Sequence, residues 1–157
     1  FPLLVRYGLG AVLGIPAASI CDHSTRSYCS WAELREMSRC RRIAIAAHGY
    51  THQSLDAANA DFFTEVVIAN QELRARIGRP VESYVYPYGR ISPQAQHRVQ
   101  AHYRYSFRIG SADNADWNQR LMYRVKADAM LAPDALFSAA RLAAYRMRRS
   151  WNMLRRR

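Results

Sequence analysis

Two histidines four residues apart are the side chains in this sequence whose spacing most clearly suggests chemistry. His48 and His52 stand within AAHGYTHQSL, residues 46–55, directly after the apolar alternation of residues 42–46. That alternation predicts a buried strand, so His48 is expected where the strand ends. If a helical turn separates them, both imidazoles lie on one face and can bind one divalent metal ion. The same spacing also fits two unrelated surface histidines.

A metal site of this kind needs more than the pair. Two neutral imidazoles hold a divalent ion weakly, and a carboxylate normally completes a three-ligand site with an open position. Parallel α/β folds build such sites at the carboxyl ends of their strands, which is where His48 is expected. Gly49 lets the chain leave the strand in a tight turn. The sequence therefore predicts two of the three protein ligands of a metal site.

The elements that would position this pair alternate between strand and helix. Ser30 and Glu33 form a capping-box pattern, Ser92-Pro93 is a cap followed by a first-turn proline, and Gly78 is typical of a helix end. The expected strands are residues 11–15, 43–47, 81–86, 103–109 and 121–125, and the expected helices are residues 1–7, 31–39, 61–77, 93–101 and 133–154. This order predicts an α/β fold with about five parallel strands, either a sheet or a partial (β/α) barrel with outer helices. A closed barrel needs more strands, which we expect before Phe1.

The helix over residues 61–77 has the strongest periodicity in the chain. We expect the face with three- and four-residue spacing to pack on the sheet, namely Phe63, Val66, Val67, Asn70, Leu73 and Ile77.

Length and composition bound the class of protein. The chain has 157 residues, half of them hydrophobic, which predicts one globular domain over residues 1–157. No apolar run approaches the roughly 18 residues of a membrane span. No signal peptide is visible, and the first residue is not Met, which is consistent with a fragment or a processed form.

Charge and cysteines leave several readings open. The net charge is +11, and residues 141–157 form a predicted basic helix with seven arginines and no acid. Such a helix can bind nucleic acid, anionic lipid or an acidic partner, or it can be an ordinary solvated helix. Cys21, Cys29 and Cys40 fit no zinc pattern. Cys21 and Cys29 bracket a short loop and fit a disulfide in an oxidising compartment, but free thiols fit equally well.

Several stretches together resemble the polysaccharide deacetylase family, the metal-dependent carbohydrate esterases that remove acetyl groups from glycans. HGYTHQSL, residues 48–55, is similar to the family's second motif, and YVYPYG, residues 84–89, to its third. The segments 30–35 and 73–80 stand where the family has matching elements, and 1–9 looks like the segment after its first motif. The resemblance runs from Phe1 to about residue 128 and lies nearest the poly-N-acetylglucosamine deacetylase branch. It implies a distorted (β/α) barrel that lacks its first strand.

The resemblance implies a site and a reaction. His48 and His52 would bind a divalent metal, zinc above all, and the backbone amide of Tyr88 would help to hold the oxyanion. Tyr86, Pro87 and Tyr88 would line the substrate groove, with Tyr86 and Tyr88 stacking on sugar faces. Trp31 fits the same role, although packing under a helix start is the commoner use. The implied reaction is hydrolysis of N-acetyl or O-acetyl groups on an amino-sugar polysaccharide, outside the cytoplasm or at the cell envelope.

This sequence departs from the family pattern at the catalytic acids and bases. The family's first motif has two adjacent aspartates, a general base and a third metal ligand, but this sequence contains no Asp-Asp. We expect that motif upstream of Phe1 and an impaired activity in its absence. Val85 replaces the arginine of the third motif, for which Arg79 or Arg90 would have to compensate, and the family's late catalytic histidine is missing.

The sequence does not show which other titratable residue could replace the missing aspartates or the missing catalytic histidine. The remaining histidines, His23, His97 and His102, are expected on the surface, and nothing selects among the acids Asp113, Asp116 and Asp128. Two alternatives to catalysis therefore stay open. One is a non-catalytic relative that binds glycan through its tyrosines, and the other is a protein that binds nucleic acid or membrane through its basic C-terminal helix.

Overall fold

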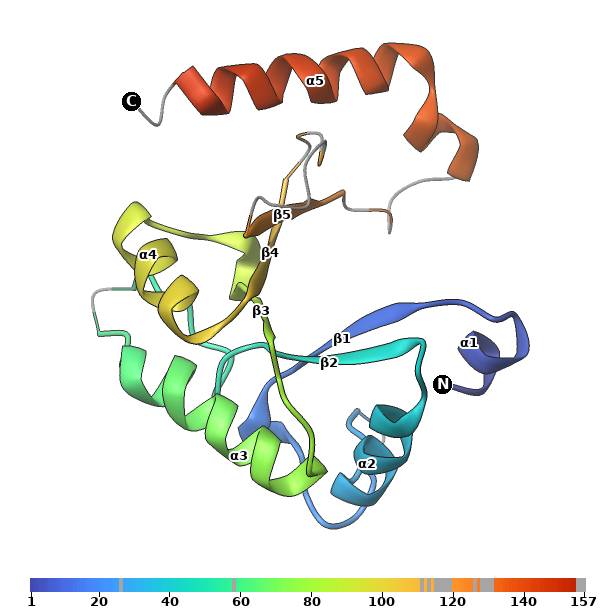
Figure 1. Cartoon of the computed structure of the whole chain (residues 1–157), viewed down its shortest axis with the longest axis vertical. Coiled ribbons are helices and arrows are strands. Elements are labelled where there is room, and N and C mark those ends of the chain that lie inside the picture. The colour runs from blue at the N-terminus through green and yellow to red at the C-terminus, as the bar shows by residue number, and fades with distance from the viewer. Residues whose placement is uncertain are drawn as a thin grey trace.

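A computed structural model of the chain describes residues 1–25, 27–57, 59–110, 112, 114, 120–125, 127 and 132–154. Five strands alternate with helices along the chain (Figure 1). The strands are β1 Ala11–Ile15, β2 Ile43–Ala47, β3 Ser83–Val85, β4 Tyr105–Ile109 and β5 Leu121–Arg124. The helices are α1 Pro2–Arg6, α2 Trp31–Arg39, α3 Ala69–Ile77, α4 Pro93–His102 and α5 Ala139–Leu154.

All five strands form one parallel sheet in the order β1-β2-β3-β4-β5. The order never reverses, so the helices between the strands lie on one side, as in a barrel and unlike a doubly wound sheet. Val12 of β1 and Met122 of β5 line the same cavities although their strands are the two edges of the sheet. The sheet therefore curls strongly, and the predicted partial barrel with outer helices is confirmed.

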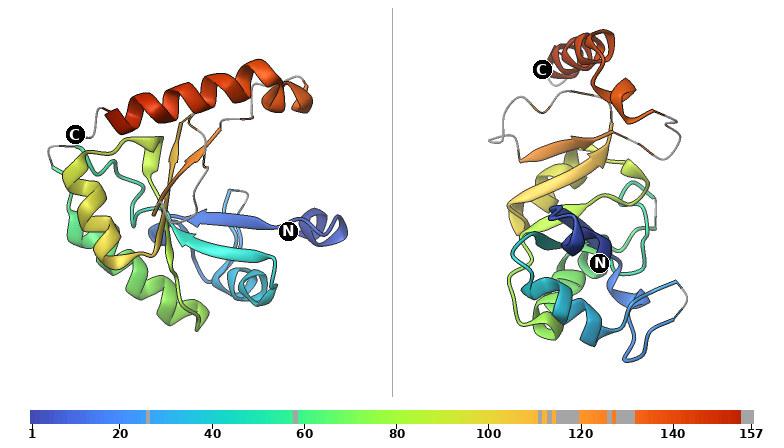
Figure 2. Two further views of the ribbon diagram at one scale, coloured as in Figure 1. Left: turned by 45° about the horizontal axis from the view of Figure 1, so that its top comes forward. Right: turned by 90° about the vertical axis from the view of Figure 1, so that its right-hand side faces the viewer.

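The core lies between the sheet and helices α2, α3 and α4, which cover its convex side (Figure 2). Leu34, Val66, Leu73, Tyr84 and Val99 are fully buried there. Helix α5 lies apart from this layer, beside β4 and β5, where Asn152 Nδ2 lies 3.3 Å from the Tyr123 hydroxyl. No helix in the described part of the chain is both long and apolar enough to span a membrane.

Local sequence signals fix several helix ends as predicted. Ser30 Oγ accepts from the Glu33 N–H at 3.3 Å, and Glu33 Oε2 accepts from the Ser30 N–H at 2.7 Å, which is a complete capping box. Ser92 Oγ accepts from the Ala95 N–H at 3.1 Å and begins α4. Gly78 ends α3 with a φ of 69°, a left-handed conformation that favours glycine.

Four predicted elements differ in the structure, including β4, which begins at Tyr105 and not at residue 103. The helix expected over residues 61–77 begins with a π-helical segment, Phe63–Ile68, before α3. A π-helix closes its hydrogen bonds one residue later than an α-helix, which turns its side chains. Phe63, expected on the buried face, is therefore 59% exposed, while Glu65 is buried. The expected last helix is broken at Ser138, whose ψ of 147° separates a 3₁₀ turn from α5. Strand β3 is also shorter than expected.

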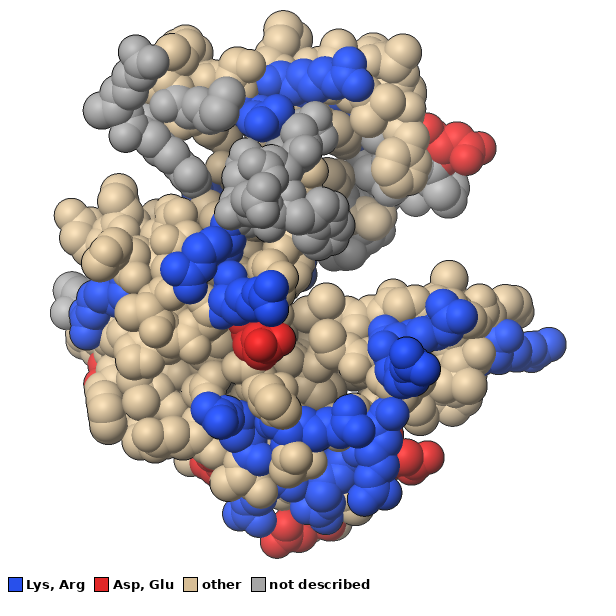
Figure 3. All heavy atoms as spheres, in the orientation of Figure 1, with Lys and Arg blue, Asp and Glu red and all other residues tan. Residues whose placement is uncertain are grey.

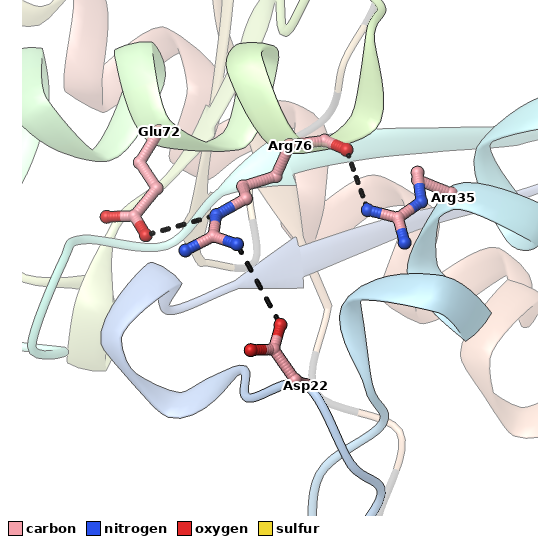
Figure 4. A network of polar contacts seen from close by, with 4 residues as sticks. All are labelled: Asp22, Arg35, Glu72 and Arg76. Carbon is pink, nitrogen blue, oxygen red and sulfur yellow. Dashed lines mark hydrogen bonds and ion pairs between the residues drawn. The ribbon is translucent and has the colours of Figure 1, made fainter.

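An arginine joins α2, α3 and the loop after β1 (Figure 4). Arg76 lies 3.8 Å from both Glu72 and Asp22, and its carbonyl accepts from Arg35 Nη1 at 3.3 Å. Exposed ion pairs of this length contribute little, about 0–1 kcal/mol each. The guanidinium also lies over the ring of Trp31, 5.3 Å from its centroid. Trp31 is only 3% exposed, so it packs under the helix start and is not available to a sugar.

Candidate active site at the carboxyl end of the sheet

His48 follows β2 directly and is fixed at both its backbone and its ring. Its N–H donates to Ile15 O at 2.9 Å, which extends the β1–β2 pairing by one residue. Its Nδ1 lies 2.7 Å from the carbonyl oxygen of Val85, which can only accept, so Nδ1 carries the proton. Burial lowers the pKa of His48, and the nearby His52 and Arg124 lower it further, against the opposing effect of the Val85 bond. A neutral ring whose Nε2 carries no proton is the form that binds metal.

His52 brings its ring onto His48. The two Nε2 atoms are 3.1 Å apart and the ring centroids 4.5 Å apart, so the histidines are neighbours and not separate surface residues. Residues 48–52 do not form the helical turn through which the spacing could have placed both rings on one face. Gly49 and His52 have φ angles of 79° and 68°, so the chain reverses through left-handed conformations instead. This bend turns the His52 imidazole back toward the end of β2.

A buried carboxylate holds the bend that carries the histidines. Glu65 is 2% exposed, and its Oε2 accepts from the Tyr50 N–H at 2.9 Å and the Gln53 N–H at 3.3 Å. Its Oε1 accepts from the Thr51 N–H at 3.0 Å and from the Thr51 hydroxyl. The sequence analysis missed this residue. Its spacing was a signal: Glu65 stands four residues before Ala69 and eight before Leu73, so on a helix it shares the buried face of those two residues.

Tyr88 stands beside the histidines at the end of β3. Its ring centroid lies 4.8 Å from that of His52, edge to face, and the side chain is 64% exposed. Its φ of 57° is again left-handed. Gly89 follows with a φ of 69°, and a Cβ there would meet Ile109 Cβ at 2.8 Å, so the turn packs tightly on β4.

The structure corrects the roles expected for the neighbours of Tyr88. The Tyr86 side chain is completely buried, and its ring meets that of Tyr84 edge to face at 5.2 Å. Pro87 is buried as well. Tyr84 and Tyr86 are two residues apart in an extended chain, so both side chains lie on its core-facing side. Tyr88 lies in the turn that follows, with a left-handed φ of 57°, and its side chain points to solvent. The predicted sugar-stacking face of Tyr86 is therefore covered, and Tyr88 is the tyrosine of the motif that a ligand can reach.

A cavity of about 410 Å³ lies beside His48 on the concave side of the sheet. Its lining comes from four strands and includes Val12, Gly14, Val85, Phe107, Tyr123 and Arg124. Arg124, at the end of β5, is the arginine near His48. Arg79 instead lines a cavity at the amino ends of the strands, and Arg90 is exposed. Sequence reasoning missed Arg124, although its place at a strand end was a signal.

The other candidate residues lie elsewhere or outside the described part. His97 and His102 line a separate hollow with Phe62 and Phe63, and His23 is exposed in the loop after β1. Asp113, Asp116 and Asp128 lie outside the described residues. The three cysteines are free thiols.

The histidine pair fits two positions of a metal site and no more. Both Nε2 atoms converge, and the proton on Nδ1 of His48 leaves its Nε2 available. Within the described residues, however, no group of three His, Cys, Asp or Glu side chains could hold a metal ion. Glu65 does not add a ligand, because both its oxygens accept from the loop backbone.

The sequence profile of the polysaccharide deacetylases matches residues 1–106. This chain belongs to the polysaccharide deacetylase family. The match covers both the histidine loop and the Tyr88 turn, whereas Arg124 lies beyond it. No curated protein sequence matches the chain significantly.

Solved structures of deacetylases share the fold of this family member. Streptococcus pyogenes deacetylase PplD, solved with acetate, has a TM-score of 0.74 over 87% of this chain and 61% of its own. IcaB from Ammonifex degensii has a TM-score of 0.70 over 92% and 64%. BC0361, a polysaccharide deacetylase from Bacillus cereus, has a TM-score of 0.64 over 74% of this chain but only 37% of its own. Each is 16% identical, so these likenesses establish the fold.

Proposed function

We propose that this deacetylase-family chain carries part of a metal-dependent site that hydrolyses N-acetyl groups on an amino-sugar polysaccharide. The observation that carries the proposal is the convergence of the two imidazoles, with Nε2 atoms 3.1 Å apart and the proton of His48 held on Nδ1 by Val85. A hydrogen bond from the far ring nitrogen to a carbonyl is the usual support of a metal-binding histidine. Zinc suits imidazole ligands in an open site.

The residues of the chain take distinct roles in this proposal. His48 and His52 bind the ion, which when bound polarises the acetyl carbonyl and activates a water molecule. The Tyr88 backbone amide donates to the developing oxyanion, and its exposed ring stacks on a sugar face. Arg124 adds positive charge at the cavity beside His48, where negative charge develops.

Family membership supports a proposal for the substrate class and the compartment. An acetylated glycan is the substrate that membership implies, and PplD was solved with acetate, the product of deacetylation. Such glycans lie outside the cytoplasm or at the cell envelope, so we place the protein there. The missing carboxylate among the described residues predicts that this polypeptide alone binds zinc weakly and deacetylates slowly.

Zinc titration of the 157-residue chain tests the proposal. We expect weak binding that His48→Ala or His52→Ala reduces at least tenfold, because each removes one of two ligands. His97→Ala is the matched control, since His97 is exposed in a separate hollow, and it should bind zinc as the wild type does. Equal zinc binding by all four proteins would refute the assignment of the ligands. Fast, chelator-resistant release of acetate from an N-acetylglucosamine oligomer would refute metal dependence.

The incomplete ligand set favours a second candidate function, glycan binding without catalysis. Among the described residues, Tyr88 offers an exposed ring at the site, and no third ligand accompanies the histidines. If the chain only binds glycan, affinity for an N-acetylglucosamine oligomer should fall on Tyr88→Ala and stay unchanged with a chelator. Loss of binding on metal removal would contradict this alternative.

The basic surface of the protein suggests an anionic partner. Arginine side chains gather on the face of the molecule over α2 and the end of α3 (Figure 3). On α5, Arg146 and Arg148 are exposed together with Met147 and Trp151, an amphipathic composition that suits an anionic lipid surface. The last three arginines lie outside the described residues. Sedimentation with anionic vesicles that is lost on charge reversal of Arg146 and Arg148 would support an anionic partner, and equal sedimentation would contradict it.

A further inference from the structure

Glu65 is a buried acid that the proposed chemistry does not use. It is 2% exposed, and no Lys or Arg among the described residues forms an ion pair with it. A buried carboxylate is costly unless hydrogen bonds compensate for the lost water. All four bonds given to its oxygens come from the loop that carries His52, from Tyr50, Thr51 and Gln53. In the part of the chain that the structure describes, the hydrogen bonds of this carboxylate therefore go to this loop.

We propose that Glu65 is a positioning residue, which fixes the histidine loop so that His52 meets His48 before any metal binds. The inference rests on the proposed metal-binding function of the pair. His52 has a left-handed φ of 68°, a conformation that side chains other than glycine rarely adopt. The Gln53 and Thr51 N–H groups flank His52, and both donate to Glu65. Anchoring the peptide on each side of His52 holds it in that conformation.

The geometry requires a carboxylate at this position. The four donors are distributed over both oxygens, two on Oε1 and two on Oε2. Glutamine has the same shape but only one acceptor oxygen, and its NH₂ group would face N–H donors. An amide therefore leaves about half of the donors unpaired. Strong hydrogen bonds to a charged acceptor are lost as well.

The helix that carries Glu65 is built to deliver it to the loop. The residue lies within the π-helical segment Phe63–Ile68, whose winding turns it onto the same buried side as Val66, Ala69 and Leu73. π-Segments of this kind occur often at functional sites. The apolar residues of this stripe pack in the core, so the carboxylate is held from a rigid base.

Glu65→Gln tests the proposal, with Glu36→Gln as the control. Glu36 is an exposed acid on α2, so its variant removes one charge without touching the loop. Hydrogen exchange of the metal-free protein is the first measurement. We expect Glu65→Gln to speed exchange of the Tyr50, Thr51 and Gln53 amides roughly tenfold or more, because each loses a bond to a charged acceptor, while β2 keeps its protection. Glu36→Gln should change neither.

Zinc affinity is the second measurement. Loss of a group that orients a metal ligand typically reduces affinity about 10–100-fold, and we expect a loss of this size for Glu65→Gln and none for Glu36→Gln. Unchanged loop exchange in Glu65→Gln overturns the proposal, as does unchanged zinc affinity in a wild type that binds zinc. If the wild type binds no zinc, the proposed function fails, but the exchange data still decide whether Glu65 holds the loop.

Thr51→Val keeps the proposal testable if Glu65→Gln does not fold. Thr51 is exposed, and the substitution removes only the hydroxyl that donates to Oε1. We expect a folded protein with faster exchange at the loop amides and a zinc affinity below that of the wild type. A Thr51→Val protein with wild-type exchange and wild-type affinity would overturn the role assigned to these bonds.

Discussion

Substituting Gly49 by alanine probes the contact between the histidine loop and Glu65 most directly. Gly49 has a φ of 79°, and a Cβ built on it would fall on Oε2 of Glu65, far inside van der Waals contact. The far end of a glutamate side chain normally moves away at little cost. Here it cannot, because the carboxylate is buried and both oxygens accept from loop N–H groups. Gly49→Ala therefore strains the backbone and displaces the carboxylate together.

The two effects have separable magnitudes. A non-glycine residue in the left-handed region costs about 1–2 kcal/mol. Displacing Oε2 weakens its bonds to the Tyr50 and Gln53 N–H groups, and one lost bond to a charged acceptor costs about 1.5–3 kcal/mol. Gly49→Ala should therefore lower the free energy of unfolding by roughly 2.5–5 kcal/mol, a large share of the ~5–15 kcal/mol typical of a domain.

Gly78→Ala is the matched control for the free-energy cost of placing alanine in the left-handed region. Gly78 has a φ of 69°, close to that of Gly49, but a Cβ there has no atom within 4 Å. We expect urea denaturation to give a loss of only about 1–2 kcal/mol for Gly78→Ala. In a Glu65→Ala background the cost of Gly49→Ala should fall toward this value, since the carboxylate is gone and only the His52 backbone, at 3.3 Å, stays close to the added Cβ. Equal losses for the two glycine variants in the wild-type background would refute the reasoning.

Three further predictions concern the core and the helix ends. Burial raises the pKa of Tyr84, of Tyr86 to about 12, and of Tyr103, each from 10.0. The folded protein therefore keeps protons that the unfolded chain loses, so stability is complete below pH 10 and should fall as the pH rises above it, in step with tyrosinate absorbance. Tyr103→Phe should cost about 1–3 kcal/mol in urea denaturation, because the hydroxyl donates to the buried Val66 carbonyl at 2.7 Å. Ser30→Ala should lower the melting temperature through a loss of about 1 kcal/mol, and an unchanged value would contradict the capping role.

The sequence predicted most of what depends on local chemistry. The bounds of β1 and β2 agree with the apolar alternations, and the Ser30 capping box and the Gly78 helix end follow from side chains within a few residues. The order of elements sufficed for a singly wound parallel sheet. The four-residue spacing suggested that the two histidines could share one face through a helical turn, and their rings do meet, although through a left-handed bend.

The parts that the sequence did not predict depend on contacts between distant residues. A spacing of four residues suggested a helical turn, but the bend at His52 is fixed by Glu65, thirteen residues further along the chain. The motif around Pro87 did not show which tyrosine is buried, because that depends on the register of β3 in the sheet. Arg124 reaches the His48 cavity only because the sheet curls its last strand toward its first.

Backbone strain in this protein is concentrated at the proposed site. Among the described residues, His52 and Tyr88 are the two non-glycine positions with positive φ, and their rings lie 4.8 Å apart. Each conformation costs about 1–2 kcal/mol and persists only where the surrounding structure determines it. Glu65 supplies that support for His52, and the tight packing of Gly89 on Ile109 supplies it for Tyr88. Glycine would relieve the strain but would remove both the imidazole and the exposed ring. The fold therefore accepts strain where these two side chains face one another, which is the arrangement that the proposed metal site and sugar-binding ring need.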